Sequence, residues 1–296
     1  MSSFLQAVID GIGLGAVYAV VAVGIGLVFG VMRLVNLAYG ELITAAAYTL
    51  AFLSGAPSVV AIAACFAVAI VGALVMERVA FRPLRGASPA TMLVASFAIS
   101  FLLQNVYLLS FGSRGSTVGT LGGLNTAIAI GTLRIRWISV VAIIVGAVLL
   151  AGLTLFLNRT TVGLHLRASA ADFRTARLLG VRADRVIAFS FAISGALAAA
   201  VAVLLTVQSP LVTPDFGVQV TIFALIGVVV GGLDRLATAT AGGFLIGFAT
   251  AFVGDELPSS SSVYLPSVVY GLVIAVLLLR PGGLFAGGRG LSAERV

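Results

Sequence analysis

The chain has 296 residues, of which 60% are hydrophobic and 9% charged, and its mean hydropathy is +1.20. Soluble domains carry about 25% charged residues, so this composition cannot cover a globular surface with polar side chains. It excludes a soluble protein and indicates one that lies in a bilayer. Nine spanning helices would use about 180 residues, which leaves no room for a separate soluble catalytic domain.

The rare residues exclude several kinds of chemistry. All 17 basic residues are arginine, and a Walker A loop needs a lysine on the nucleotide phosphates, so the chain does not hydrolyse ATP by that route. His165 and Cys65 are the single histidine and cysteine, too few for a His/Cys metal cluster. We therefore expect no catalytic residue, no metal site and no cofactor. Because the arginines lie in short loops between apolar runs, no nucleic-acid partner is expected despite the net charge of +7.

Apolar runs separated by polar breaks predict an all-α polytopic membrane protein with eight to ten transmembrane helices, forming a single transmembrane domain over residues 1–296. The nine expected spans are 8–30, 35–54, 58–76, 90–111, 137–157, 186–206, 218–232, 237–254 and 263–280. The second contains Asn36 and Glu41 and is also compatible with a broken or re-entrant element. The seventh is short and ends at Gly231-Gly232, which is compatible with a discontinuity.

The arginines also predict an orientation. The segment 158–185 holds six of the 17 arginines against two acids, which makes it the best candidate for a cytoplasmic loop. If successive loops alternate between the two sides of the membrane, starting from that loop, 14 arginines lie inside, the N-terminus lies outside and the C-terminus lies in the cytoplasm. The segment 112–136 carries three arginines and no acid, yet this assignment places it outside.

Within the loop 158–185, residues 168–179 are rich in alanine, arginine and leucine, which favour helix. We expect one short amphipathic helix there, closed by a glycine cap at Gly180, before the next span starts at Val186. Such a helix is also compatible with one that merely lies at the membrane interface.

Four stretches carry a resemblance to a known family. Arg174 to Gly180 resembles a degenerate Glu-Ala-Ala-x-x-x-Gly loop of ABC importer permeases, in which Ala176 and Gly180 match. Asn36 to Glu41 is similar to an Asn-x-Ala-x-Gly-Glu signature, and Gly231-Gly232-Leu233, with the glycines that follow it, resembles a late glycine-rich pattern. Arg280 to Phe285 resembles an Arg-Pro-x-Gly-Leu-Phe ending. In order and spacing the chain resembles the LivH-type permeases of branched-chain amino acid ABC transporters.

The resemblance implies a machine in the bacterial plasma (inner) membrane. Its expected partners are two cytoplasmic ABC ATPase subunits, a sister permease or a second copy of this chain, and a substrate-binding protein outside. The expected cargo is a branched-chain amino acid; related permeases for other amino acids, amides or urea remain an alternative. An ion-driven secondary transporter is less favoured, because nearly every charge lies at a span end rather than at mid-membrane.

In this family the loop 158–185 would carry a coupling helix that docks on an ATPase subunit. The expected docking core is Ala176, Leu178, Leu179 and Gly180, and the expected rim is Arg174, Arg177 and Arg182.

Asn36, Tyr39, Gly40 and Glu41 are the candidate residues of the translocation pathway, since a broken helix exposes backbone groups only in a cavity or inside protein. The alternative is that Glu41 pairs with Arg33 and that Asn36 caps a helix. The clustered glycines, such as Gly15, Gly243 and Gly247, are expected to pack helices rather than bind ligand.

Overall fold

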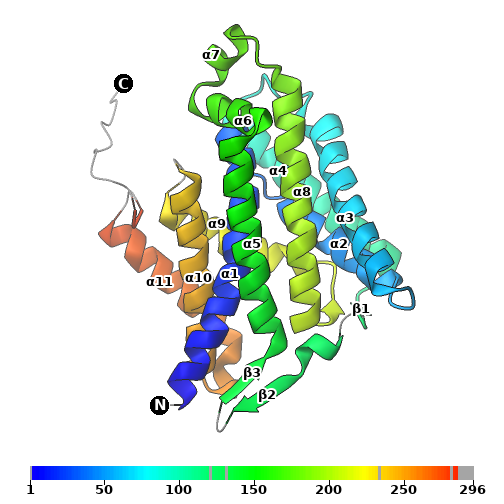
Figure 1. Ribbon diagram of the computed structural model, residues 1–296, viewed down its shortest axis with the longest axis vertical. Helices are drawn as coiled ribbons and strands as arrows, with labels where there is room; N and C mark the ends of the chain where they lie inside the picture. Colours follow the sequence, from blue (N-terminus) through cyan, green and yellow to red (C-terminus); the bar gives the residue numbers. More distant parts are fainter. Residues whose placement is uncertain (1, 120–121, 131–132, 233–234, 281–282, 286–296) are drawn as a thin grey trace.

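The computed structural model describes residues 2–119, 122–130, 133–232, 235–280 and 283–285. The long helices of these segments lie roughly along the long axis of the molecule (Figure 1). The helices are α1 (Ser2–Met32), α2 (Tyr39–Phe52), α3 (Ser58–Val75), α4 (Pro89–Phe111), α5 (Trp137–Arg159), α6 (Thr161–Ala171), α7 (Phe173–Leu178), α8 (Ala183–Gln208), α9 (Phe216–Gly231), α10 (Leu236–Glu256) and α11 (Leu265–Leu279).

Shorter elements connect these helices. A π-helical turn, η1 (Met76–Phe81), continues α3 without a break, and 3-10 turns form at η2 (Gly122–Asn125) and η3 (Ser259–Tyr264). The strand β1 (Ser116–Thr117) pairs antiparallel with β4 (Leu211–Val212). The hairpin of β2 (Ala127–Ile130) and β3 (Leu133–Arg136) leads directly into α5.

All nine predicted spans form helices. In the described part of the chain, six helical segments are long and apolar enough to cross a membrane: α1, α3 with η1, α4, α5, α8 and α10. By contrast α2, α9 and α11 have 14, 16 and 15 residues, fewer than the about 20 that a full crossing takes. The second expected span begins in a non-helical link, residues 33–38, and α2 is then continuous from Tyr39 to Phe52, so this segment is a short helix and not a broken one.

The core is built around α1, which packs against α5, α8, α9 and α10. Val17, Val20 and Val21 of α1 are fully buried. Glycines bring α1 and α10 into backbone contact: a Cβ added to Gly247 would lie 2.7 Å from the carbonyl oxygen of Leu14. The prediction that these glycines pack helices is therefore confirmed for this pair of helices.

Unlike α1, most of whose apolar side chains are buried, α3, α4 and α5 expose large apolar side chains on the outside of the molecule. On α4, Phe97 and Phe101 are each 62% exposed and Leu109 is 86% exposed. Soluble proteins rarely expose apolar side chains on this scale, whereas the hydrocarbon of a bilayer accepts them. Cys65 of α3 is buried, as expected for a lone cysteine in an apolar run.

The two ends of the molecule differ in charge. Figure 1 shows α6 and α7 together at one end, with the β2–β3 hairpin and the N-terminus at the other. At the hairpin end the Arg136 guanidinium lies 3.8 Å from the Asp10 carboxylate, which also accepts a hydrogen bond from Ser139. Arg136 belongs to the segment 112–136, whose three arginines lie on the expected outer side, and the charge of this one is paired with an acid.

The C-terminal motif lies only partly within the described residues. Leu233 of the glycine-rich pattern, Pro281, Gly282 and the tail 286–296 lie outside them. The amide of Leu284 donates to the carbonyl of Val230 at 2.7 Å, so the end of this motif packs against the end of α9.

Candidate functional site

The segment expected to be one amphipathic helix is two helices, and that prediction was wrong. The helix α6 ends at Ala171, and Asp172 has extended backbone angles of φ −149° and ψ 103°. Its carboxylate accepts hydrogen bonds from the amides of Arg174 and Thr175, which caps α7. The hydrogen bonds from Thr175 are the main reason that the pKa of Asp172 lies below its ordinary value.

The end of α7 has the glycine cap that the sequence predicted. Gly180 has a φ of +89°, a region that favours glycine over residues with a side chain. Its amide donates to the carbonyl of Arg177, and the amide of Val181 donates to that of Ala176. This pair of bonds is the Schellman arrangement, which ends α7 sharply and turns the chain toward α8.

The surface of α7 is apolar at its tip and basic around it. Leu178 and Leu179 are 83% and 80% exposed. They are apolar, yet α7 holds them outside the apolar body of the molecule. The expected rim residues, which are also exposed, are Arg174, Arg177 and Arg182. Ala176 is only 3% exposed, so it packs beneath α7 and supports this surface rather than forming part of it.

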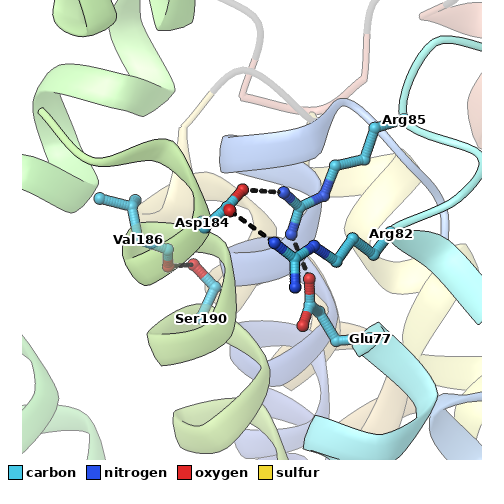
Figure 2. Close-up of polar contacts among 6 residues, drawn as sticks. All are labelled: Glu77, Arg82, Arg85, Asp184, Val186 and Ser190. Carbon is cyan, nitrogen blue, oxygen red and sulfur yellow. Dashed lines mark hydrogen bonds and ion pairs between the residues drawn. The ribbon is translucent and has the colours of Figure 1, made fainter. Parts of the chain in front are cut away.

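A cluster of ion pairs joins the chain just after α7 to the connection between α3 and α4. Figure 2 shows Arg85 between two acids, Asp184 of α8 and Glu77 of η1, and it forms ion pairs with both. Arg82 adds a second contact to Asp184 at 2.8 Å. Glu77 is buried while Asp184 is exposed, so the cluster links the surface near α7 to the interior.

The same turn η1 also contacts the candidate pathway. The Asn36 side-chain amide donates to Met76 Sδ at 3.8 Å, and Met76 directly precedes Glu77. The Asn36 Oδ1 accepts from the amide of Ala38 at 3.0 Å, immediately before α2 begins. Asn36 is 2% exposed, and it therefore holds the non-helical link between α1 and α2 against η1.

Glu41 is fully buried in the first turn of α2 and faces α4. Its Oε1 accepts hydrogen bonds from Ser100 Oγ at 2.7 Å and from Gln104 Nε2 at 3.1 Å. Tyr107 donates to the backbone carbonyl of Glu41 at 3.0 Å. The Oε2 atom has no hydrogen-bond partner among the described residues. The alternative pairing with Arg33 was wrong, because the Arg33 side chain reaches the carbonyl of Ala170 instead.

The start of α2 also meets the start of α9. A Cβ on Gly40 would lie 2.7 Å from the carbonyl oxygen of Gly217, so only glycine permits this approach. The amide of Gly217 donates to Thr44 Oγ1 at 3.0 Å. Tyr39 is fully buried against α1, where a Cβ on Gly24 would lie 2.7 Å from its ring.

The structure thus brings Asn36, Tyr39, Gly40 and Glu41 to one buried junction of α1, α2, α4 and α9. Sequence reasoning missed their partners Ser100, Gln104 and Tyr107, as well as the ion cluster. The described residues contain no group of three or more His, Cys, Asp or Glu side chains that could hold a metal ion.

Comparison with known proteins gives one consistent result. The family model described as "Branched-chain amino acid transport system / permease component" matches residues 7–279. The high-affinity branched-chain amino acid transport system permease protein BraD of Pseudomonas aeruginosa is 34% identical, over 95% of each chain. The corresponding protein LivH of Escherichia coli K12 is 32% identical, also over 95% of each chain.

A more distant relative is a sugar permease. The ribose import permease protein RbsC of Haemophilus influenzae is 26% identical over 63% of this chain and 58% of its own. No solved structure matches the chain.

Proposed function

Because the chain belongs to the permease family of branched-chain amino acid transport systems, we propose that it is the membrane-spanning subunit of an ABC importer that translocates branched-chain amino acids across the bacterial inner membrane. The observation that carries this proposal is the exposed Leu178–Leu179 tip of α7, which is surrounded by arginines at one end of the molecule. The chain itself has no lysine and therefore no Walker A motif. The energy would come from separate ATPase subunits.

The partners follow from this division of labour. Two cytoplasmic ATPase subunits would each dock on an α7 surface, one on this chain and one on a sister permease or a second copy of it. A substrate-binding protein would deliver the amino acid at the hairpin end. Orientation with the N-terminus outside and the C-terminus inside is supported by the arginines at the α6–α7 end.

The docking surface would be Leu178 and Leu179, with Arg174, Arg177 and Arg182 around them. Exposed leucines on a short, capped helix supply apolar area for a protein contact, while the arginines supply its polar rim. Gly180 closes the helix, and the buried Ala176 fixes it on the body of the permease.

A chain of contacts would carry movement of α7 into the membrane. It runs from Asp184 through Arg85 and Glu77 on η1, then from Met76 to Asn36 and α2. A π-helical turn at this place fits such a role, because π-turns are frequently found at functional sites. The junction around Glu41 would then open and close between α2, α4 and α9.

The test is uptake by proteoliposomes that contain the permease with its ATPases and binding protein. We expect leucine, isoleucine and valine to enter only with ATP, and to enter equally well after the ion gradients are collapsed. Uptake that needs an ion gradient and ignores ATP would refute the proposal. Preference for other amino acids, amides or urea in the same assay would correct the substrate alone.

A further inference from the structure

A cavity of about 180 Å³ opens at the α6–α7 end, and its lining includes none of the residues of the proposed docking surface. Three arginines from separate parts of the chain line it: Arg33 after α1, Arg167 on α6 and Arg235 before α10. The remaining wall is mainly apolar, with Leu27, Leu166 and Leu236 among its residues.

The three guanidinium groups have no acid to neutralise them among the described residues. Of the described acids at this end, Glu77 and Asp184 pair with other arginines and Asp172 caps α7, while Asp234 lies outside the described residues. The Arg33 guanidinium donates to an uncharged acceptor, the backbone carbonyl of Ala170, at 3.2 Å. Three positive charges at one cavity repel each other, so an anion bound there would stabilise the arrangement.

The backbone of Arg33 supports a role for its side chain at this place. Its φ is +52°, the only positive value at a non-glycine residue in the described part of the chain. Residues with a Cβ are uncommon in this left-handed region, and such strained residues cluster at functional sites. The turn carries the Arg33 side chain across to α6 at the mouth of the cavity.

The cavity continues into an apolar groove. A second hollow of about 370 Å³ shares Leu157, Arg167 and Leu236 with the first. It runs between α5 and α10, with Val23 of α1 at its base. Its other wall residues are Leu150, Leu153, Thr154, Asn158, Ala237 and Thr240. A basic pocket thus leads directly into a groove that points along the membrane helices.

We propose that this cavity and groove bind one anionic glycerophospholipid, with the phosphate on Arg33, Arg167 and Arg235 and an acyl chain between α5 and α10. Basic pockets between membrane helices on the cytoplasmic side recognise such headgroups, and guanidinium groups bind phosphate through paired hydrogen bonds. A free phosphate would use the arginines alone, whereas the apolar groove fits only a ligand with a chain. The proposal is independent of the transported substrate.

The experiment is native mass spectrometry of the purified permease complex in mixed micelles with equal phosphatidylglycerol and phosphatidylcholine. We expect one phosphatidylglycerol per chain to stay bound preferentially. The double variant Arg167→Gln/Arg235→Gln should weaken this binding about thirtyfold, since each basic residue near an anionic headgroup is worth about fivefold. The matched control is Arg185→Gln, which removes an exposed arginine at the same end but outside the cavity.

Two further arms decide the outcome. Thr154→Trp, which fills the groove, should release phosphatidylglycerol, and inorganic phosphate at the same concentration should not displace it. Equal retention of the two lipids, displacement by phosphate, an effect of Arg185→Gln as large as that of the double variant, or no effect of Thr154→Trp would each overturn the proposal.

Crosslinking keeps the test independent of folding. A photoreactive phosphatidylglycerol with its probe on the acyl chain should label α5 and α10 peptides of the unaltered complex. Labelling confined to other helices would refute the site. Protection of these peptides only when the sister permease is present would show that a protein surface, not a lipid, covers the groove.

Discussion

Glu41 combines complete burial with one partnered and one unpartnered carboxylate oxygen. A purely structural acid would be expected to use both oxygens, because an unsatisfied buried polar atom costs about 1–3 kcal/mol. A carboxylate that exchanges hydrogen-bond partners between two conformations of the transporter would leave one of its oxygens without a partner in each conformation. We therefore expect the Glu41 side chain to take part in the transport cycle.

The substitution Glu41→Gln separates transport from stability. The glutamine keeps an oxygen that can accept from Ser100 and Gln104, so the thermal unfolding temperature should stay close to that of the unchanged protein. Uptake should fall at least about tenfold, the effect of losing one charge-assisted hydrogen bond of about 1.5–3 kcal/mol. The measurement is uptake per assembled complex alongside unfolding of the same preparation.

The control is Asp10→Asn, which neutralises an acid of α1 that contacts Ser139 and Arg136 and not the Glu41 junction. It should leave uptake unchanged. If Glu41→Gln transports normally while Glu41→Ala unfolds early, Glu41 is part of the scaffold and not of the pathway.

The sequence identifies Asn36 and Glu41 because polar residues stand out in an apolar run. It does not identify Ser100, Gln104 or Tyr107 as their partners. These residues lie 59–66 positions away from Glu41 on α4, and serine or tyrosine in a membrane helix carries no local signal. Only the packing of α2 on α4 shows that they meet.

At the scale of elements, α7 and its glycine cap are the feature most directly tied to coupling. A valine at Gly180 would be strained at φ +89°, and strain of this kind costs about 1–3 kcal/mol. We expect Gly180→Val to shift the Leu178–Leu179 tip and to reduce ATPase stimulation by the loaded binding protein several-fold. ATP hydrolysis by reconstituted complexes, with and without binding protein, measures this effect.

A matched control exists at the end of α4. Gly112 ends α4 with a φ of +74° and, like Gly180, has open space around the position of a Cβ. The substitution Gly112→Val introduces comparable strain far from α7 and should leave stimulation intact. Equal losses in the two variants would show that strain alone, not docking, explains the defect.

The ion cluster predicts that Asp184 and Glu77 act through the same arginine. Asp184→Asn should change stability by less than about 1 kcal/mol, because exposed ion pairs contribute little. Both Asp184→Asn and Glu77→Gln should lower the amount of substrate imported per ATP. If Arg85 connects them, the double variant should lose less than the sum of the two single effects.

The measurement is the ratio of uptake to ATP hydrolysis in all four members of this mutant cycle. Arg78→Gln serves as the control, since Arg78 is an exposed residue of η1 outside the cluster. Additive single effects would contradict a shared route through Arg85.

The elements themselves could largely be predicted, and the exceptions have a physical cause. Long apolar runs between polar breaks define helices such as α1 and α8 with little ambiguity. The division between α6 and α7 was missed because the alanine, arginine and leucine around Asp172 all favour continuous helix. What breaks it is one side chain: the Asp172 carboxylate binds the amides of Arg174 and Thr175 more favourably at a helix start than in a helix interior.

At the scale of the whole molecule, the charge difference between the two ends predicts the orientation in the membrane. The lone Cys65 is buried, so Cys65→Ala gives a background without an accessible thiol. In that background Arg114→Cys should react with a membrane-impermeant maleimide in intact cells, and Arg177→Cys only after permeabilisation. The reverse pattern would invert the topology.

One consequence of the junction between α2 and α9 concerns electrostatic potential. The aligned peptide dipoles of a helix place roughly half a positive charge at its N-terminus. Gly40 and Gly217 are in contact near the N-termini of their helices, so two such positive ends face each other inside the protein. Each helix also begins with an acid, Glu41 in the first turn of α2 and Asp215 just before α9. The two positive helix ends therefore offset part of the negative charge that Glu41 and Asp215 bring to this buried junction.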